Sequence, residues 1–238
     1  MERQIIKRIN LFAHQSKAIR ESATFPYRLI FRLPGTGKTF IGVEILKKII
    51  FENNSTYCLW IGPANLLKQY KDVFDDVGLF SYYFNSSKKE FLRNACAIVS
   101  YETFRLNIET FLDFSWDCII CDEAHRAKST QTQINQALKK IRVKTNRFYA
   151  FSGTPFQNSP YEFFQLISLI AGKNLTNCLE QTLQYMRPKK NFIRNFLFFL
   201  GFKMNRLNQG PIIGVKEPGK LFKLVNKYVD YIPPSQYL

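Results

Sequence analysis

The sequence predicts an α/β domain built on a parallel sheet that is covered by helices on both faces. Short apolar runs with strand character alternate with helix-like runs of about ten residues. Helices of this length supply the long crossover connections that parallel strands require. The chain has 238 residues, 46% of them hydrophobic, which is enough for a large domain with a buried core.

The expected elements follow one another in alternation. Strands are expected at 28–33, 57–61, 95–100, 116–121 and 147–151. Helices are expected at 39–51, 65–74, 101–111, 131–141 and 160–171. The first of these helices carries Ile41, Ile45 and Ile49 on one side, at helical spacing. We expect this α/β domain to occupy residues 1–171.

Residues 172–238 differ from the rest in composition, and we expect them to form a basic, mostly helical extension. They contain eleven Lys and Arg residues but three Asp and Glu residues, which is half of the net charge of +16. Their most apolar stretch, 191–202, includes Arg194 and is shorter than the ~18 residues of a membrane helix. We therefore expect no membrane partner.

The surplus of 34 Lys and Arg residues over 18 Asp and Glu residues favours a polyanionic partner. Nucleic acid is the usual one, because lysines and arginines release counterions from its phosphates. A solvated basic surface that aids solubility remains the alternative. Abundant Lys, Asn, Ile and Phe residues are typical of an AT-rich genome, viral or bacterial.

The five cysteines are odd in number and follow no signal peptide, which favours free thiols in a reducing, intracellular compartment. Cys118 and Cys121 form a CxxC pair. Residues three apart on a strand point to opposite faces, so these two sulfurs should not share a metal ion.

A glycine-rich segment, 34–39 (PGTGKT), stands between a predicted strand and a predicted helix. This is the setting of a phosphate-binding loop, in which backbone N–H groups surround phosphate oxygens. Lys38 would reach the phosphates of ATP and the Thr39 hydroxyl would hold Mg²⁺. Arg32 replaces the first glycine of the full pattern, which leaves a turn with a chance Lys-Thr pair as the alternative. The nucleotide-binding candidates here are Pro34, Gly35, Thr36, Gly37, Lys38 and Thr39.

A second segment, 119–125 (IICDEAH), delivers two adjacent carboxylates at the end of an apolar strand. Ligands bind at this edge of parallel sheets, and neighbouring acids favour a cation between them. Asp122 would hold Mg²⁺, partly through water, and Glu123 would orient or deprotonate the attacking water. With Lys38, these are the catalytic candidates, and His125 would couple the site to a moving partner. An Asp-Glu helix cap is the alternative.

A third segment, 151–158 (FSGTPFQN), again follows a predicted strand. Short hydroxyls on such a turn can bridge catalytic carboxylates to a moving partner, although an ordinary strand-to-helix loop would look similar. The coupling candidates are Ser152, Thr154 and Gln157.

Three segments resemble motifs I, II and III of superfamily-two helicases in their order and spacing. These segments are LPGTGKT, CDEAH and SGTPFQN. The SGTPFQN form and the YEFFQL that follows it are most similar to the Swi/Snf branch. The resemblance spans residues 10–171 and implies a RecA-like lobe that uses ATP and Mg²⁺ and acts on double-stranded DNA. It further implies that Gln15, within LFAHQ, reads adenine, and that the segment with Pro63 and Lys68 contacts the DNA backbone.

The chain departs from this family in two respects. Arg32 and Leu33 stand where acidic or small residues are usual, and motifs IV to VI have no counterpart. We therefore expect a second RecA-like lobe in cis or in trans. The clustered charge of the extension separately predicts that it binds phosphates through Lys189 and Lys190, unless these lysines are solvated or pair with the second lobe. A strand-separating helicase or restriction-type motor, and a non-catalytic nucleic-acid-binding module, are the alternative functions.

Overall fold

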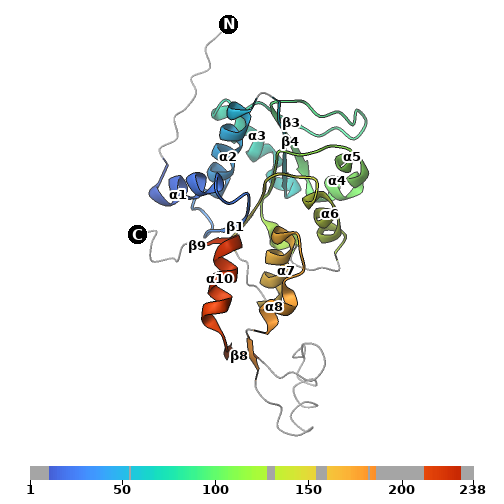
Figure 1. The fold of residues 1–238 in the computed structure, drawn as a ribbon. Helices are drawn as coiled ribbons and strands as arrows, with labels where there is room; N and C mark the ends of the chain where they lie inside the picture. Colours follow the sequence, from blue (N-terminus) through green and yellow to red (C-terminus); the bar gives the residue numbers. More distant parts are fainter. Residues whose placement is uncertain are drawn as a thin grey trace.

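A seven-stranded, entirely parallel sheet forms the centre of the molecule, which confirms the predicted fold class (Figure 1). The computed structural model describes residues 11–53, 55–127, 132–153, 160–181, 183–185 and 212–231. The strand order is β3-β4-β2-β5-β6-β1-β9. The strands are β1 (Tyr27–Phe31), β2 (Tyr57–Gly62), β3 (Ser81–Tyr83), β4 (Ala95–Ser100), β5 (Cys118–Cys121), β6 (Phe148–Ser152) and β9 (Val229–Tyr231).

Helices cover both faces of this sheet, and each face has its own cluster of buried apolar residues. One face carries α1 (Ala13–Ser22), α2 (Lys38–Glu52) and α3 (Leu67–Asp76). The other carries α4 (Tyr101–Leu106), α5 (Ile108–Leu112), α6 (Gln133–Arg142), α7 (Pro160–Ala171) and α10 (Pro218–Tyr228). The remaining elements are α8 (Thr176–Glu180), the 3-10 turns η1 (Ala64–Leu66) and η2 (Ala124–Ala127), and the two-stranded sheet of β7 (Leu183–Tyr185) and β8 (Ile212–Val215).

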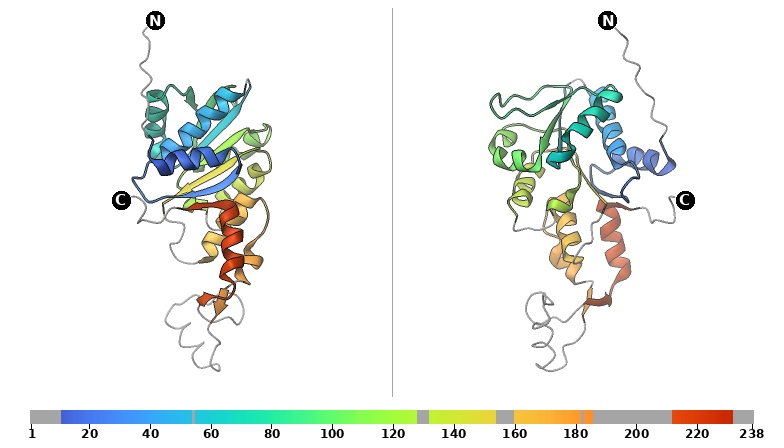
Figure 2. Two further views of the ribbon diagram at one scale, coloured as in Figure 1. Left: turned by 60° about the vertical axis from the view of Figure 1, so that its left-hand side comes forward. Right: turned by 180° about the vertical axis from the view of Figure 1, so that it is seen from behind.

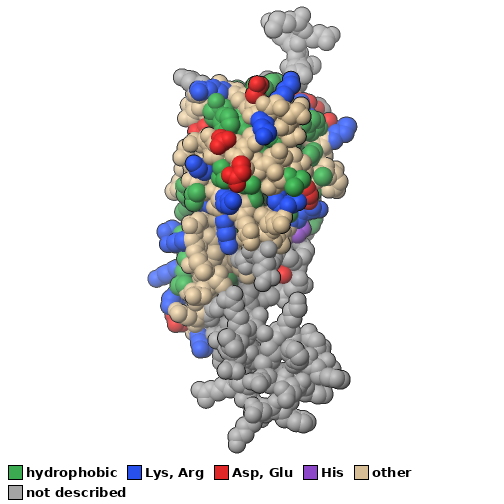
Figure 3. All heavy atoms as spheres, turned by 90° about the vertical axis from the view of Figure 1, so that its right-hand side faces the viewer, with side chains coloured by type: hydrophobic (Ala, Val, Ile, Leu, Met, Phe, Trp, Pro, Cys, Tyr) green, Lys and Arg blue, Asp and Glu red, His purple; other side chains and the backbone are tan. Residues whose placement is uncertain are grey.

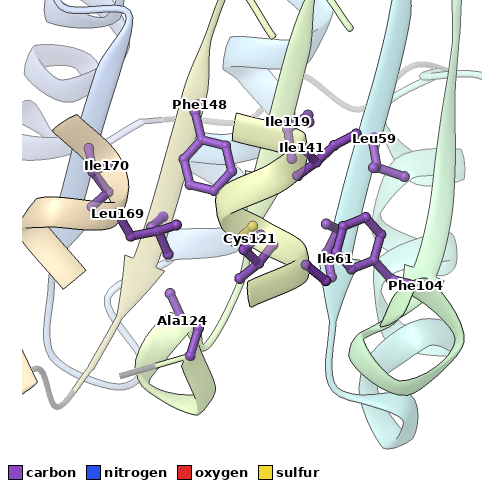
Figure 4. Packing of buried hydrophobic residues seen from close by; sticks show 14 of the residues in the cluster. Leu59, Ile61, Phe104, Ile119, Cys121, Ala124, Ile141, Phe148, Leu169 and Ile170 are labelled. Carbon is purple, nitrogen blue, oxygen red and sulfur yellow. The ribbon is translucent and has the colours of Figure 1, made fainter. Parts of the chain in front are cut away.

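The central strand β5 contributes side chains to both clusters, as a strand buried on two faces must. Cys121 packs with Ile119 under α6, and Figure 4 shows this side of the sheet. Cys118 and Ile120 instead join the cluster on the opposite face. The two cysteines of the CxxC pair therefore point away from each other, which confirms that they do not share a metal ion.

The C-terminal segment returns to the sheet. Helix α10 lies beside α7 and packs Leu221, Leu224, Val225 and Tyr228 against the core (Figures 1 and 2). Strand β9 follows it and pairs in parallel with β1, so a segment beyond residue 171 completes the sheet. This strand was not expected from the sequence, and the division of the chain at residue 171 stays a prediction.

Two predicted helices differ from the observed ones in detail. The helix expected at 101–111 is divided at Asn107, whose side-chain amide donates to the carbonyl oxygen of Thr103 (2.8 Å) and ends α4. The helix expected at 65–74 begins two residues later, at Leu67 after η1, and ends at Asp76. In the part of the chain that the structure describes, no helix is long and apolar enough to cross a membrane. The Phe-rich stretch 191–202 lies outside the described residues.

Candidate nucleotide-binding site

The loop between β1 and α2 has the backbone geometry of a phosphate cradle. Gly35 and Gly37 both adopt left-handed conformations, with φ of 78° and 76°. A side chain at Gly37 would also collide with Gln15, because its Cβ would lie 2.3 Å from Nε2. Gly37 caps α2, so the positive end of this 15-residue helix faces the loop. Both glycines are thus required by conformation, and the loop suits an anion.

Lys38 projects its amine from the start of α2 toward the edge of the sheet. The side chain is buried, and Nζ lies 3.5 Å from the carbonyl oxygens of both Arg32 and Leu33. A Cβ on Gly153, which follows β6, would lie 3.4 Å from the same nitrogen. Burial raises the pKa of Asp122 and the positive charge of Lys38 partly opposes this, whereas the pKa of Glu123 is lowered, first by His125 and also by Lys38. The amine therefore stands between the loop and the acidic pair.

Asp122 follows β5 and is 4% exposed. Both of its carboxylate oxygens accept hydrogen bonds of 2.9 Å, Oδ2 from the Tyr70 hydroxyl and Oδ1 from the backbone N–H of Glu123. Burial is the largest influence on its pKa and raises it, whereas the bond from Tyr70 lowers it. A buried carboxylate held in one orientation fits the ligand preference of Mg²⁺.

The number of protein ligands also fits magnesium. Among the described residues, no three His, Cys, Asp or Glu side chains gather as a metal site. Mg²⁺ at nucleotide sites needs only one or two protein ligands, because phosphates and water complete its shell. Thr39, the half-buried second residue of α2, and Asp122 are the side chains that would hold it.

Glu123 has a left-handed backbone, with φ of 50°, which is uncommon for a residue with a side chain. Such strain persists where the surrounding structure enforces it, often at active sites. Its Oε2 lies 3.1 Å from Nδ1 of His125, although without the alignment of a well-formed hydrogen bond. This contact is the largest cause that lowers the pKa of Glu123, and Lys38 and the N–H of Gly153 act in the same direction. These contacts favour the ionised form of Glu123.

Gln15 lies against the loop rather than in open solvent. Its Nε2 donates to the carbonyl oxygen of Thr36 (3.2 Å), and its Oε1 accepts from the backbone N–H of Phe12 (2.9 Å). His14 also approaches the Thr36 carbonyl oxygen, at 3.3 Å. Gln15 therefore joins α1 to the phosphate loop, and its role in reading adenine stays a prediction.

The remaining predicted site residues differ from one another in burial and in their contacts. Ser152 ends β6, is fully buried, and accepts a bond from the backbone N–H of Arg32 through its carbonyl oxygen (3.2 Å). Pro63 is buried at the start of η1, whereas the Lys68 side chain is 84% exposed and pairs with Asp72. Outside the described residues lie Thr154, Gln157, Lys189 and Lys190.

Two tyrosines that hold Asp122 were not predicted from the sequence. Tyr70 binds its side chain, and the hydroxyl of Tyr101 donates to its backbone carbonyl oxygen (2.7 Å). Tyr70 lies two residues after Lys68, in the segment whose resemblance implies a contact with the DNA backbone, but no sequence pattern reveals that a residue 52 positions earlier reaches the carboxylate. Arg32, noted only as a departure from the family pattern, forms a buried ion pair with Asp230.

A parallel sheet whose carboxyl edge carries a glycine loop, a lysine and an Asp-Glu pair defines the RecA-like lobe of a superfamily-two ATPase. The profile of the SNF2-related domain matches residues 29–195. The chain belongs to this family.

Individual relatives agree with this assignment. Protein CHROMATIN REMODELING 25 of Arabidopsis thaliana is 39% identical over 113 residues, which are 46% of this chain and 12% of that protein. The human DNA repair and recombination protein RAD54-like is 42% identical over 73 residues, 31% of this chain and 10% of that protein. The chain thus spans about an eighth or less of the length of these relatives. Because one is a plant protein and the other a human protein, they give no support to the expected viral source.

A solved structure shows the same fold. The Sulfolobus solfataricus SWI2/SNF2 ATPase core in complex with dsDNA superposes with a TM-score of 0.70 at 18% sequence identity. The match covers 96% of this chain and 46% of that one.

Proposed function

We propose that this chain is the ATP-binding lobe of a nucleic-acid-dependent ATPase that moves along double-stranded DNA. The observation that carries the proposal is the convergence of Lys38, Asp122 and Glu123 at one edge of the sheet, beside a glycine loop. In this proposal, the loop and Lys38 bind the phosphates of ATP. Glu123, held ionised, orients the attacking water and accepts its proton. Mg²⁺, when bound, neutralises charge on the transferring phosphoryl group.

Double-stranded DNA is the proposed partner, through its phosphates. The net charge of +16 supports this choice, and basic side chains are spread over much of the face in Figure 3, where acidic ones are fewer. The related SWI2/SNF2 core bound to dsDNA supports a duplex rather than a single strand. A DNA partner also places the protein inside the cell, in the cytoplasm or nucleus.

A second RecA-like lobe, in cis or in trans, completes the proposed enzyme. An arginine from such a partner typically stabilises the transition state and is worth about 10³–10⁵ in rate. The lobe alone should therefore bind ATP but hydrolyse it poorly.

Hydrolysis by a form that carries both lobes tests this proposal. Duplex DNA should stimulate ATP hydrolysis, and the enzyme should displace a third strand from a triplex while leaving the two duplex strands paired. Separation of the duplex would instead identify a strand-separating helicase. The proposal would be contradicted if a preparation that binds ATP hydrolysed it at the same rate with and without DNA. Lys38→Ala is the control for contaminating ATPases.

A further inference from the structure

Tyr70 lies in the middle of α3 and joins that helix to the acidic pair. It is 1% exposed, and its hydroxyl donates to Oδ2 of Asp122 at 2.9 Å. Its ring packs against Trp60, with 5.2 Å between ring centroids. It also lies directly over Gly62, where an added Cβ would stand 2.5 Å from the tyrosine ring. The absence of a side chain at Gly62 therefore allows the hydroxyl to reach Asp122.

The hydroxyl of Tyr70 and the backbone N–H of Glu123 hold the two carboxylate oxygens of Asp122 from different directions. One bond alone would leave the carboxylate free to turn about its terminal torsion, which is broad for Asp. Two bonds fix its plane. Tyr101 does not share this role, because its hydroxyl binds the backbone carbonyl oxygen of Asp122.

The Tyr70 hydroxyl has a single proton to donate, and it donates that proton to Oδ2 of Asp122. A metal-holding carboxylate is commonly oriented in this way by a neighbouring hydrogen-bond donor.

We propose that Tyr70 is a positioning residue of the nucleotide site, whose hydroxyl fixes the carboxylate of Asp122 in the orientation that holds Mg²⁺. The proposal rests on the proposed function, because that function assigns Asp122 to the metal. It also makes α3 part of the site: a displacement of this helix would turn the carboxylate.

The variant Tyr70→Phe tests this proposal in the present chain, because it removes the hydroxyl and keeps the ring. Binding of a fluorescent, non-hydrolysable ATP analogue is measured during a Mg²⁺ titration and again in EDTA. The Mg²⁺ concentration at half-saturation should rise about tenfold, the usual loss when a donor to a metal ligand is removed. Affinity in EDTA should not change. An unaltered Mg²⁺ midpoint would overturn the proposal.

Tyr149→Phe is the matched control for a lost buried hydroxyl. Tyr149 is equally buried, and its hydroxyl donates to the carbonyl oxygen of Ser22 at the end of α1 (2.8 Å). This variant should lose stability and keep the wild-type Mg²⁺ midpoint. An equal shift in both variants would show general loosening of the fold and would also overturn the proposal.

Asp122→Asn separates this inference from the proposed function. If that variant retains the wild-type Mg²⁺ dependence, Asp122 does not hold the metal and the assignment on which the inference rests is wrong. If Asp122→Asn abolishes the dependence while Tyr70→Phe preserves it, only the role of Tyr70 is refuted.

Discussion

Arg32, the residue that follows β1, and Asp230 of β9 form a buried ion pair although they are 198 positions apart in sequence, with 2.5 Å between Nη2 and Oδ2. The same guanidinium donates to the carbonyl oxygen of Asp230 at 2.8 Å. Arg28, on β1 itself, donates to the carbonyl oxygen of Val229 at 3.2 Å. The strand that leads into the phosphate loop is thus fastened to the last described strand of the chain.

This ion pair predicts a large loss of stability for Asp230→Ala. The substitution leaves the guanidinium of Arg32 buried without its partner, which typically costs about 3–5 kcal/mol. Urea unfolding followed by circular dichroism measures the loss. Glu109→Ala, which breaks the exposed pair of Glu109 with Lys140, is the control and should cost far less, because water screens that pair. Equal effects of the two substitutions would mean that the ion pair does not hold β9.

Glu123→Gln should separate binding from hydrolysis. In a form of the enzyme with both lobes, ATP binding should stay near the wild-type level, because the contacts proposed for the phosphates are those with the loop and Lys38. Hydrolysis should collapse, because an amide cannot accept the proton of the attacking water. Calorimetry and a phosphate-release assay measure the two properties. Weakened binding with preserved turnover would make Glu123 a structural residue.

The cysteines should differ sharply in reactivity. Burial raises the pKa of Cys58 to about 12 and those of Cys96, Cys118 and Cys121 well above the ordinary value. The thiolate is the reactive form. As pH rises through 9, an ordinary exposed thiol ionises while these four keep their protons and stay inaccessible. Cys178 is only partly buried.

An aromatic disulfide reagent at pH 8 should therefore label Cys178 alone in the folded protein, and all five cysteines after unfolding in urea. Rapid labelling of Cys118 or Cys121 in the folded state would contradict the position of β5 at the centre of the sheet.

The sequence predicted those parts of the fold whose pattern is local. The bounds expected for β4 and α7 coincide with the observed ones, because their apolar runs end at clear breaks. The phosphate loop and the Asp-Glu pair also occupy the predicted edge of the sheet. Strand β9 was missed because three residues carry no pattern of their own. Only pairing with β1 and the contact of Asp230 with Arg32 define it.

The site was predicted in part for a similar reason. A glycine loop or an acidic pair is visible within a few neighbouring residues. The contact of Tyr70 with Asp122, in contrast, depends on how α3 packs on β2. No local sequence pattern predicts that packing. The polar α1 was also missed, because few apolar residues mark its buried side.

Binding to duplex DNA should be independent of sequence and should weaken steeply with salt. The logarithm of the association constant should fall by roughly 0.9 per logarithm of salt for each phosphate contacted. Replacing Lys189 and Lys190 together by Ala should lower this slope by up to about two and spare nucleotide binding. Lys47 and Lys48, which pair with Glu44 and Glu52 on α2, are the control pair. Identical slopes for wild type and the Lys189/Lys190 variant would mean that these two lysines do not meet phosphates.

Calorimetry of Mg²⁺–ATP binding to this chain and to Lys38→Ala tests the central claim most directly. In the proposed function, Lys38 supplies the charge that faces the phosphates, and Lys47→Ala on the same helix serves as the control for a lost lysine. The account predicts that Lys38→Ala weakens binding at least tenfold, about 1.4 kcal/mol, while Lys47→Ala does not change it. Equal affinity of the wild type and a folded Lys38→Ala variant would contradict the assignment of the loop as the ATP site.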